Sequence, residues 1–591
     1  MATLKSRMRS AVKQQSIPSH SENATMNRAG GVAFEISDPA TKLVTMTGGS
    51  FFAEPRYYEG DLAAARVTAG RGADVKNRFE KLQKRLEVTK DKIKWLDTSG
   101  VDEVTSEVLA TAAAIAEGDN PEDLLAIARW LRHDMNIRAT PQALLVLASR
   151  MDSTKPFVRK YAPTIVVRPD EVKTCMLMHR FFFGMKTLKN CLAQGLSDAM
   201  SKFGEKALLK YNSAGWPTWK DVLQVLPRGR GRPLPKAMAD YFLKGEVVDP
   251  AATPVIAARK ALTQCKAFDG EAKRLAVESA VNWEVLLSQF GNDKCKVWEY
   301  LVKNDLVGYM AMLRNLRNLL EAKVGRDTVY KVCEMIANRD KVLRSKQLPF
   351  RFISAARAVQ GVGVADAADV SQVLTAIGEA SNVAAESIEL PGSTAIFVDA
   401  SGSMSTASVS EKSMVDCAQA AAAMAAIVAK AAERPYLYEF ATDVRAVRFS
   451  KADSVVSICG KFSCSGVNGH GTEGWKIPLA MIGAGLTPDR VIVLSDMQCW
   501  SVGWSEHSFC DTWKEYRQSS KAAAQTWMHS IHLNGYGDTP IDEQNHVNQV
   551  GGFSEKVFGM LLEAEGCKQA GAEQPVEPVP TIEQIREKWA L

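Results

Sequence analysis

The sequence predicts a multidomain protein in which an all-α region of repeated helix pairs precedes an α/β domain with a doubly wound sheet. Three observations predict this fold class. The chain has 591 residues, which is too many for one hydrophobic core. Apolar residues recur at helical spacing from about residue 60 to 385, whereas short β-rich runs alternate with helical segments beyond Pro391. A composition of 46% hydrophobic and 24% charged residues is typical of packed domains and excludes collagen-like and wholly disordered chains.

The segment at residues 1–25 is polar, basic and without hydrophobic periodicity, which predicts a disordered tail. It lacks the apolar stretch of a signal peptide, and no later segment predicts a membrane span. The 11 cysteines show neither a pairing rhythm nor zinc-ligand spacing. We therefore expect a protein of the reducing cytoplasm.

Two helix starts in the first region carry the same signal. Asn120 is predicted to cap a helix that opens at Pro121, and about twenty residues later Thr140 and Pro141 open the next helix. Each helix carries its leucines on one side, and the connection between the two is short. These features predict antiparallel helix pairs stacked along the chain, although the region has no clean sequence period.

Four apolar runs beyond Pro391 predict buried parallel strands of an open sheet. They are residues 393–399, 435–440, 490–496 and 526–534. An alanine-rich segment from about Ser413 to Glu433 is predicted as a crossover helix. Residues 568–591 are predicted as an acidic linker followed by a short helix, in which Thr581 and Gln584 have the spacing of a capping box.

The net charge of +6 is unevenly distributed along the chain. Residues 391–591 hold 16 basic and 23 acidic side chains, which leaves a net charge of +13 for the first 390 residues. Residues 141–240 alone hold 17 basic and 7 acidic side chains. A basic excess this local predicts a polyanion as the partner of the helical region.

Oxygen-bearing side chains are predicted to meet at one edge of the sheet. Asp399 and Asp496 each end a predicted strand, and the carboxyl ends of parallel strands share an edge. Ser401 and Ser403 follow Asp399 on a tight loop, and Thr472 lies in a glycine-rich segment. Two carboxylates and three hydroxyls, without thiolate or imidazole, predict a site for Mg²⁺ or Mn²⁺. The alternative is that the two aspartates cap helices or pair with nearby basic side chains.

The DxSxS pattern on a buried strand, with the later threonine and aspartate, resembles the metal-ion-dependent adhesion site of von Willebrand factor A domains. The resemblance implies that Asp399, Ser401, Ser403, Thr472 and Asp496 coordinate the metal directly or through water, with Mg²⁺ as the expected ion. It also implies that the ion keeps a position for a carboxylate of an acidic protein ligand. Residues 389–567 are the expected extent of this domain.

The basic window contains the candidate RNA-binding residues. Lysines recur at helical spacing to meet successive phosphates, aromatic rings lie between them to stack on bases, and arginines alternate with glycine in the following loop. The candidates are Lys202, Lys206, Lys210, Trp216, Lys220, Arg228, Arg230 and Arg232. Tyr211 and Trp219 are further aromatic residues of this stretch. The alternative interpretation is a solvated helix face with core tryptophans and a flexible loop.

The helical region resembles the TROVE module of the Ro ribonucleoprotein autoantigen and its bacterial relatives. The stretches that carry the resemblance are MNRAGGVAFEISD near residue 30, LLAIARWLRHDMNIRATPQALL, KYNSAGWPTWKDVL, YMAMLRNLRNLL from Tyr309 and LRSKQLPFRFISA from Leu343. With the A domain they follow the family's order over about residues 26–565. The resemblance implies that residues 26–388 form a ring of HEAT-like helix pairs. It also implies that Y RNAs bind the basic outer surface and that single-stranded 3′ ends of misfolded RNA enter the centre.

Lys210 matches a lysine that the family uses for Y RNA, but two other family contacts are not retained. Ser213 or Ala214 takes the place of an arginine, and a position near Pro227 takes the place of a histidine. Because the arginines of residues 228–232 follow the same predicted helix, we expect them to replace the lost contacts.

These observations favour a non-catalytic RNA-binding scaffold that acts in RNA quality control or processing. The resemblance implies an exoribonuclease partner, polynucleotide phosphorylase, which bacterial relatives engage through a Y RNA. The first alternative is a metal-dependent protein-adhesion module without RNA, and the local basic excess argues against it. The second is a Mg²⁺-dependent hydrolase with Asp399 as nucleophile or ligand, which lacks an evident general base and phosphate clamp.

Overall fold

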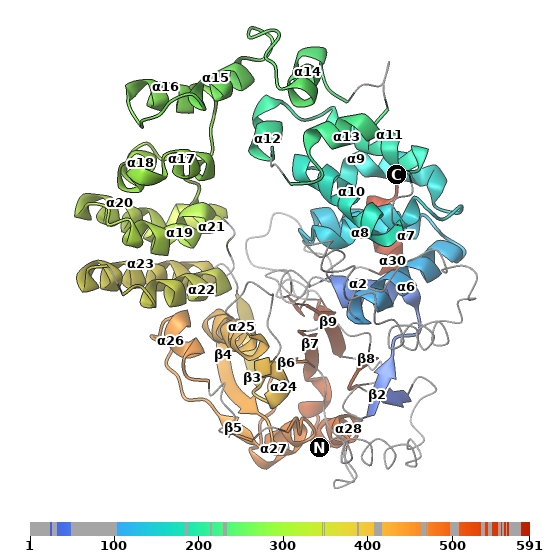
Figure 1. The fold of residues 1–591 in the computed structure, drawn as a ribbon. Coiled ribbons are helices and arrows are strands. Elements are labelled where there is room, and N and C mark those ends of the chain that lie inside the picture. The colour runs from blue at the N-terminus through green and yellow to red at the C-terminus, as the bar shows by residue number, and fades with distance from the viewer. Residues whose placement is uncertain are drawn as a thin grey trace, which may run out of the picture. The chain divides into compact units, whose positions relative to one another are not determined.

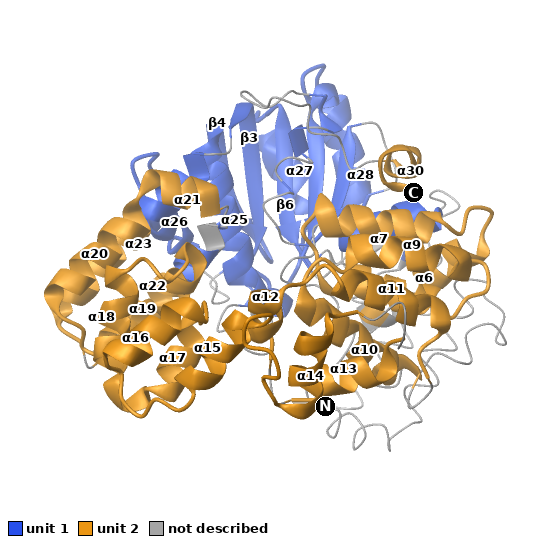
Figure 2. Ribbon diagram, turned by 90° about the horizontal axis from the view of Figure 1, so that it is seen from above, with its two compact units in different colours: residues 1–53, 346–354, 378–579 blue, residues 54–345, 355–377, 580–591 orange. Residues whose placement is uncertain are grey.

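The computed structural model describes residues 24–26, 32–48, 103–183, 187–212, 215–227, 233–345, 347, 349–363, 365–386, 389–406, 416–462, 468–469, 471–496, 508–533, 538–541, 546–552, 557, 561–562, 564–566 and 581–591. The chain forms two compact units, which Figure 2 shows in different colours. Unit 1 comprises residues 1–53, 346–354 and 378–579, and unit 2 comprises residues 54–345, 355–377 and 580–591.

Unit 2 is built, where it is described, from helices with short connections. They are α6 (Glu103–Glu117), α7 (Asp123–His133), α8 (Ala139–Ala148), α9 (Lys155–Ile165), α10 (Pro169–Phe183), α11 (Asn190–Met200), α12 (Glu205–Lys210), α13 (Trp219–Val225), α14 (Lys236–Lys244), α15 (Pro254–Leu262), α16 (Gly270–Glu278), α17 (Trp283–Gln289), η2 (Gly291–Asp293), α18 (Lys294–Lys303), α19 (Tyr309–Glu321), α20 (Arg326–Ala337), α21 (Arg339–Ser345) and α30 (Ile582–Trp589). The boundary between the units runs through α22 (Pro349–Gln360) and α23 (Ala367–Glu386). Helices pack as pairs, such as α15 on α16 and α19 on α20, and α18 also packs on α20 (Figure 1). The predicted stack of helix pairs is therefore confirmed.

The helix starts differ slightly from the prediction. α7 begins at Asp123 and not at Pro121, because the preceding residues form a turn in which the N–H of Asp123 donates to the Asn120 carbonyl oxygen (3.1 Å). The predicted Asn120 cap is therefore wrong, and the N-cap residue Glu122 makes no side-chain capping bond. α8 contains Thr140 and Pro141 in its first turn, as the sequence predicts.

The large sheet of unit 1 has, in its described residues, six strands in the order β5-β4-β3-β6-β7-β9. Their bounds are β3 (Leu390–Asp399), β4 (Ala432–Phe440), β5 (Val444–Ala446), β6 (Arg490–Ser495), β7 (Trp527–His532) and β9 (Val547–Gly551). The neighbours pair in parallel, except β4 with β5. This is the open α/β sheet that the sequence predicts, with the four predicted strands confirmed as β3, β4, β6 and β7. The prediction missed β5 and β9 because both are short and partly polar.

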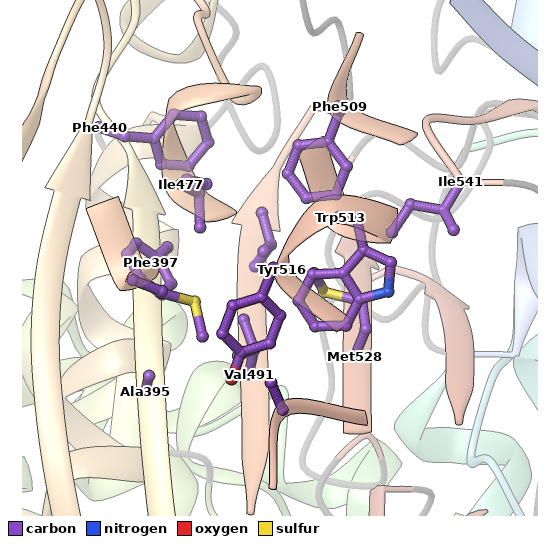
Figure 3. Close-up of a cluster of buried hydrophobic side chains, with 13 residues drawn as sticks. Ala395, Phe397, Phe440, Ile477, Val491, Phe509, Trp513, Tyr516, Met528 and Ile541 are labelled. Atoms are coloured by element: carbon purple, nitrogen blue, oxygen red, sulfur yellow. The ribbon is translucent and has the colours of Figure 1, made fainter. Parts of the chain in front are cut away.

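Helices bury the apolar strands of this sheet. The alanine-rich α25 (Cys417–Ala431) packs on β3 and β4, which confirms the predicted crossover helix. Figure 3 shows Trp513 and Tyr516 of α28 (Phe509–Ser519) beside strand residues such as Val491 and Met528. α27 (Lys476–Gly483) contributes to the same cluster. Because every residue of β6 is buried, both faces of the sheet are covered, as is usual for parallel sheets.

Residues 26–47 belong to unit 1, whereas the sequence boundary places them with the helical region. Ala24 and Thr25, predicted as the end of the disordered tail, lie in a strand, and residues 1–23 of that tail lie outside the described residues. β1 (Ala24–Met26) and β2 (Val32–Glu35) form an antiparallel sheet with β8 (Asp538–Thr539). α2 (Pro39–Thr47) packs on β9 at Gly551, where an added Cβ would lie 2.3 Å from the Thr45 carbonyl oxygen. Glycine is therefore required for this close approach. Unit 1 also contains α24 (Gly402–Thr406), α26 (Val455–Cys459) and η3 (Ala523–Gln525).

Two negative findings concern the described residues alone. None of their helices combines the length and the hydrophobicity that a membrane span requires. None of the described cysteines forms a disulfide bond.

A buried ion-pair network fastens the segment after β9 to the sheet. Arg490 donates two N–H groups to the Glu565 carboxylate (2.7 and 2.6 Å), and His529 Nε2 lies 2.8 Å from the same carboxylate. All three side chains have an exposed fraction of 5% or less. Burial alone would raise the pKa of Glu565, but hydrogen bonds from Arg490 and His529 outweigh it and hold this pKa below its ordinary value.

Replacing Glu565 by alanine is expected to lower the free energy of unfolding by about 3–5 kcal/mol, because the buried Arg490 charge loses its carboxylate. The stabilisation is full above the ordinary carboxyl pKa of about 4.3 and is lost as the pH falls, since the folded-state pKa is depressed. Urea denaturation at pH 7 measures the effect, with Glu515→Ala on the exposed face of α28 as control. Equal stability of the two variants would contradict the role of the network.

Candidate metal centre and nucleic-acid interface

The two predicted aspartates lie at the same edge of the large sheet. Asp399 is the last residue of β3, and Asp496 directly follows β6. The two strands pair in parallel with Val398 opposite Leu494, so their carboxyl ends are level. Both side chains are buried, with exposed fractions of 0% and 3%. The register of β3 and β6 therefore brings the two carboxylates together.

Hydroxyl groups surround Asp399. The Ser401 N–H donates to Asp399 Oδ1 (2.8 Å), and the hydroxyls of Ser401 and Ser403 lie 3.1 Å apart. Ser495 Oγ donates to Asp399 Oδ2 (2.5 Å). Sequence reasoning missed Ser495, although it directly precedes Asp496 at the end of a predicted strand. The serines hold the carboxylate in a fixed orientation.

The segment that carries Thr472 is held at the same end of the sheet. The N–H of Glu473 donates to the carbonyl oxygen of Ala441, the residue after β4 (2.8 Å), and the Gly471 N–H donates to Thr442 Oγ1 (3.2 Å). Gly469 has a φ of 91°, and a Cβ there would lie 2.1 Å from Thr442 Oγ1. Because β4 neighbours β3, with Phe440 opposite Asp399, the buried Thr472 lies at the edge that carries the two aspartates.

The electrostatics of this edge favour a bound cation. Burial and the charge of Asp496 raise the pKa of Asp399 to about 7. Burial and the same carboxylate raise the pKa of Cys417 to about 12, which disfavours its thiolate in the absence of a metal ion. The donors are therefore carboxylate and hydroxyl oxygens, the set that hard divalent cations prefer. Among the described residues, no group of three or more His, Cys, Asp and Glu side chains could hold a metal ion.

The candidate RNA-binding lysines do not share one helix. α12 begins only at Glu205, because Gly204 has an extended conformation with a ψ of 175°. Lys202 therefore lies in the turn after α11, and its Nζ donates to the Pro163 carbonyl oxygen (3.2 Å). The prediction of three lysines on one helix face is thus wrong for Lys202. Lys206 and Lys210 on α12 and Lys220 on α13 are exposed.

The two tryptophans of this stretch have different environments. Trp216 is 40% exposed, and the Arg180 guanidinium carbon lies 4.4 Å from its ring centroid. Trp219 is only 1% exposed, and its indole N–H donates to the Leu208 carbonyl oxygen (2.9 Å). Trp216 therefore stays a candidate for base stacking, whereas Trp219 belongs to the core.

The structure adds cations that sequence reasoning did not single out. Arg168 donates to the Tyr211 hydroxyl (2.7 Å), and its guanidinium carbon lies 5.3 Å from the ring centroid. Lys173 Nζ donates to the Tyr211 carbonyl oxygen (2.8 Å), and burial lowers the pKa of Lys173 to about 8. Arg180 completes this group. Lys173 and Arg180 lie on α10 and Arg168 directly precedes it, all before the stretch of predicted contacts, so the only sequence signal was the basic excess of residues 141–240. Arg228, Arg230 and Arg232 lie outside the described residues.

Comparisons with known proteins agree with this architecture. Residues 251–390 match the family model of the TROVE domain, and residues 394–562 match that of the Ro60 vWA domain. The crystal structure of the Ro (RSR) protein of Deinococcus radiodurans superposes with a TM-score of 0.57 at 19% identity, over 75% of this chain and 91% of that chain. At this identity the likeness establishes the fold alone.

The fold and the two matched domains define a helical-repeat protein with a von Willebrand factor A domain. The chain belongs to the TROVE-domain Ro family, a family of RNA-binding proteins. Telomerase protein component 1 of mouse is 24% identical over 310 residues, which are 43% of this chain and 12% of that protein. Its rat counterpart is 24% identical over 288 residues, which are 40% and 11% of the two chains. The alignments thus span about a tenth of these relatives.

Substitutions of the two tryptophans test the assignment of Trp219 to the core and of Trp216 to the exposed surface. Trp219→Phe is expected to lower the free energy of unfolding by about 1–3 kcal/mol, because the smaller ring leaves a cavity and the Leu208 carbonyl keeps only the N–H of Tyr211 as a donor. Trp216→Phe is expected to change it by less than about 0.5 kcal/mol, as is usual at exposed positions. Chemical denaturation of both variants measures the difference, and a larger loss at Trp216 would reverse the assignment.

Proposed function

We propose that this protein is a non-catalytic scaffold that binds a small Y-like noncoding RNA on its basic helical surface. It also binds single-stranded 3′ ends of misfolded RNA at the ring of helix pairs and acts in RNA quality control with an exoribonuclease such as polynucleotide phosphorylase. The observation that carries this proposal is the exposed group of Lys206, Lys210 and Trp216 in a chain of the TROVE-domain Ro family.

The chemistry of this group suits RNA. Exposed ammonium groups on one short helix meet phosphates, and each neutralised phosphate releases counterions. Trp216 is exposed and offers an aromatic surface to an unpaired base, while Arg180 at 4.4 Å stiffens its position. Lys173 keeps additional positive charge close by, although its hydrogen bond to Tyr211 fixes it in place, whereas the charge of Arg168 is paired with Asp170. Arg228, Arg230 and Arg232 are proposed as further phosphate contacts.

The edge of the large sheet supports a second binding role in the same protein. We propose that Asp399, Ser401, Ser403, Thr472 and Asp496 hold Mg²⁺, with Mn²⁺ as a substitute. The bound ion supplies a positive charge that offsets the two buried carboxylates and binds an acidic group of a protein partner. The observation behind this role is the pKa of Asp399, which burial and Asp496 raise to about 7.

The double variant Lys206→Ala/Lys210→Ala is expected to bind RNA more weakly and to reduce the slope of log affinity against log salt by about 1.5–2, because two phosphate contacts are lost. Fluorescence anisotropy with a hairpin RNA that carries a single-stranded 3′ overhang measures the slope at several salt concentrations. Lys266→Ala/Lys294→Ala, which removes two exposed lysines elsewhere in unit 2, is the matched control. An unchanged slope in the first variant would remove α12 from the interface.

Millimolar Mg²⁺ is expected to raise the melting temperature of the wild-type protein and to leave Asp399→Asn unchanged, because only the wild type retains both carboxylates. Without metal, the wild type is expected to lose stability relative to this variant as the pH rises from about 4 to 7. The folded-state pKa of Asp399 lies above its ordinary value, so ionisation disfavours the folded state. Glu433→Gln, an exposed carboxylate next to Gly392 at the other edge of the sheet, is the control. An Mg²⁺ shift that persists in Asp399→Asn would refute the site.

A further inference from the structure

The last helix of the chain, α30, is docked on helices that lie more than 400 residues earlier in the sequence. It packs on α7, and both belong to unit 2. We call the residues that receive it the α7 docking surface: Asp123, Arg129, His133, Asp134 and Tyr161. Neither α30 nor this surface falls within the residues matched by the TROVE and vWA family models.

α30 is amphipathic and begins with the capping box that the sequence predicts. The N–H of Thr581 donates to the Gln584 side chain (2.8 Å), and the Gln584 N–H donates to Thr581 Oγ1 (3.4 Å). Ile585 is fully buried, whereas Glu583 and Glu587 are exposed. One face of the helix thus packs on α7, and the opposite face is exposed to solvent.

An arginine fixes the register of the docked helix. Arg586 donates through Nε and Nη2 to the two carboxylate oxygens of Asp123 (2.8 and 2.7 Å). A bidentate pair of this kind specifies orientation as well as charge. Asp123 is 6% exposed, so this contact is partly shielded from water.

Trp589 makes the densest set of contacts with the α7 docking surface. Its ring stacks on His133 with centroids 5.3 Å apart, and the Arg129 guanidinium carbon lies 5.2 Å from the ring centroid. Its indole N–H donates to Asp134 (3.0 Å), and its carbonyl oxygen accepts from Arg129 (3.1 Å). The α7 docking surface is therefore complementary both to the shape of an indole ring and to its single N–H donor.

The residues after the helix are also held. The Leu591 N–H donates to the Tyr161 hydroxyl (2.8 Å), which in turn donates to Glu122 (2.7 Å). Burial and Glu122 raise the pKa of Tyr161 well above its ordinary value, so the hydroxyl keeps its proton for this bond.

We propose that the α7 docking surface is a peptide-binding site for a short amphipathic helix with the pattern Ile-Arg-x-x-Trp, and that α30 occupies it reversibly. The eight-residue helix is too short to be stable alone in water, so it folds as it docks. Because α30 belongs to the same chain as the α7 docking surface, it docks intramolecularly, at an effective concentration on the order of millimolar. Occupation by α30 of the same chain is thus favoured over a free peptide.

The test uses the full chain with Trp589→Ala, which empties the site, and a fluorescein-labelled, amidated synthetic peptide of residues 580–591. The peptide is expected to bind this variant at least tenfold more tightly than it binds the wild type, where α30 competes. A second variant, Arg586→Ala, also weakens docking. It replaces Trp589→Ala if circular dichroism shows that the first variant is poorly folded. A control peptide with alanine in place of its arginine and tryptophan is expected to bind neither the wild type nor the two variants.

The surface itself is tested in the Trp589→Ala chain. Adding Asp123→Ala is expected to weaken peptide binding at least tenfold, whereas adding Asp119→Ala, an exposed carboxylate in the preceding loop, leaves it unchanged. The proposal is overturned if the peptide fails to bind both emptied variants, if it binds the wild type equally well, or if the two aspartate changes have the same effect. RNA affinity plays no part in the readout, so the result is independent of the proposed function.

Discussion

The parallel register between β3 and β6 is the constraint on which the candidate metal centre depends. With Val398 opposite Leu494, the two strands end at one level, and Asp399 and Asp496 become buried neighbours. Burial, together with the charge of Asp496, raises the pKa of Asp399 to about 7. A slip by one residue would turn the strand side chains to the wrong faces of the sheet and separate the carboxylates. The core around Trp513 and Tyr516 resists such a slip, because its side chains interlock with alternate strand residues.

In the proposed RNA interface, the cations of the helical unit have two kinds of environment. Arg168 is bonded to Asp170 and to the Tyr211 hydroxyl, and Lys173 donates to the Tyr211 carbonyl oxygen, so both are fixed in place. Lys206 and Lys210 are exposed on α12. Because a lysine side chain is flexible, these two ammonium groups can adjust to the phosphates of a bound RNA.

Much of the fold could be predicted from the sequence, because buried parallel strands and alanine-rich helices have strong local patterns. The shared sheet edge of Asp399 and Asp496 could be predicted from their positions at the strand ends, while their role as metal ligands stays a prediction. Ser495 was missed because a serine inside an apolar run carries no signal until the strand register is known. Lys202 was misplaced because helical spacing alone does not reveal that Gly204 interrupts the helix. The docking of α30 could not be predicted, since pairing of distant segments depends on tertiary packing and leaves no periodicity in either segment.

The small sheet of β1, β2 and β8 has a consequence for how the protein is made. Phe34 pairs with Thr539, about 500 residues later in the chain. At a translation rate of about 5–20 residues per second, β8 is synthesised about 25–100 seconds after its partner strand β2. The helices of unit 2 rest on local contacts and can fold in that interval. Nascent β2 therefore presents an unpaired strand edge until β8 has been synthesised, and such an edge can pair with other chains unless it is shielded.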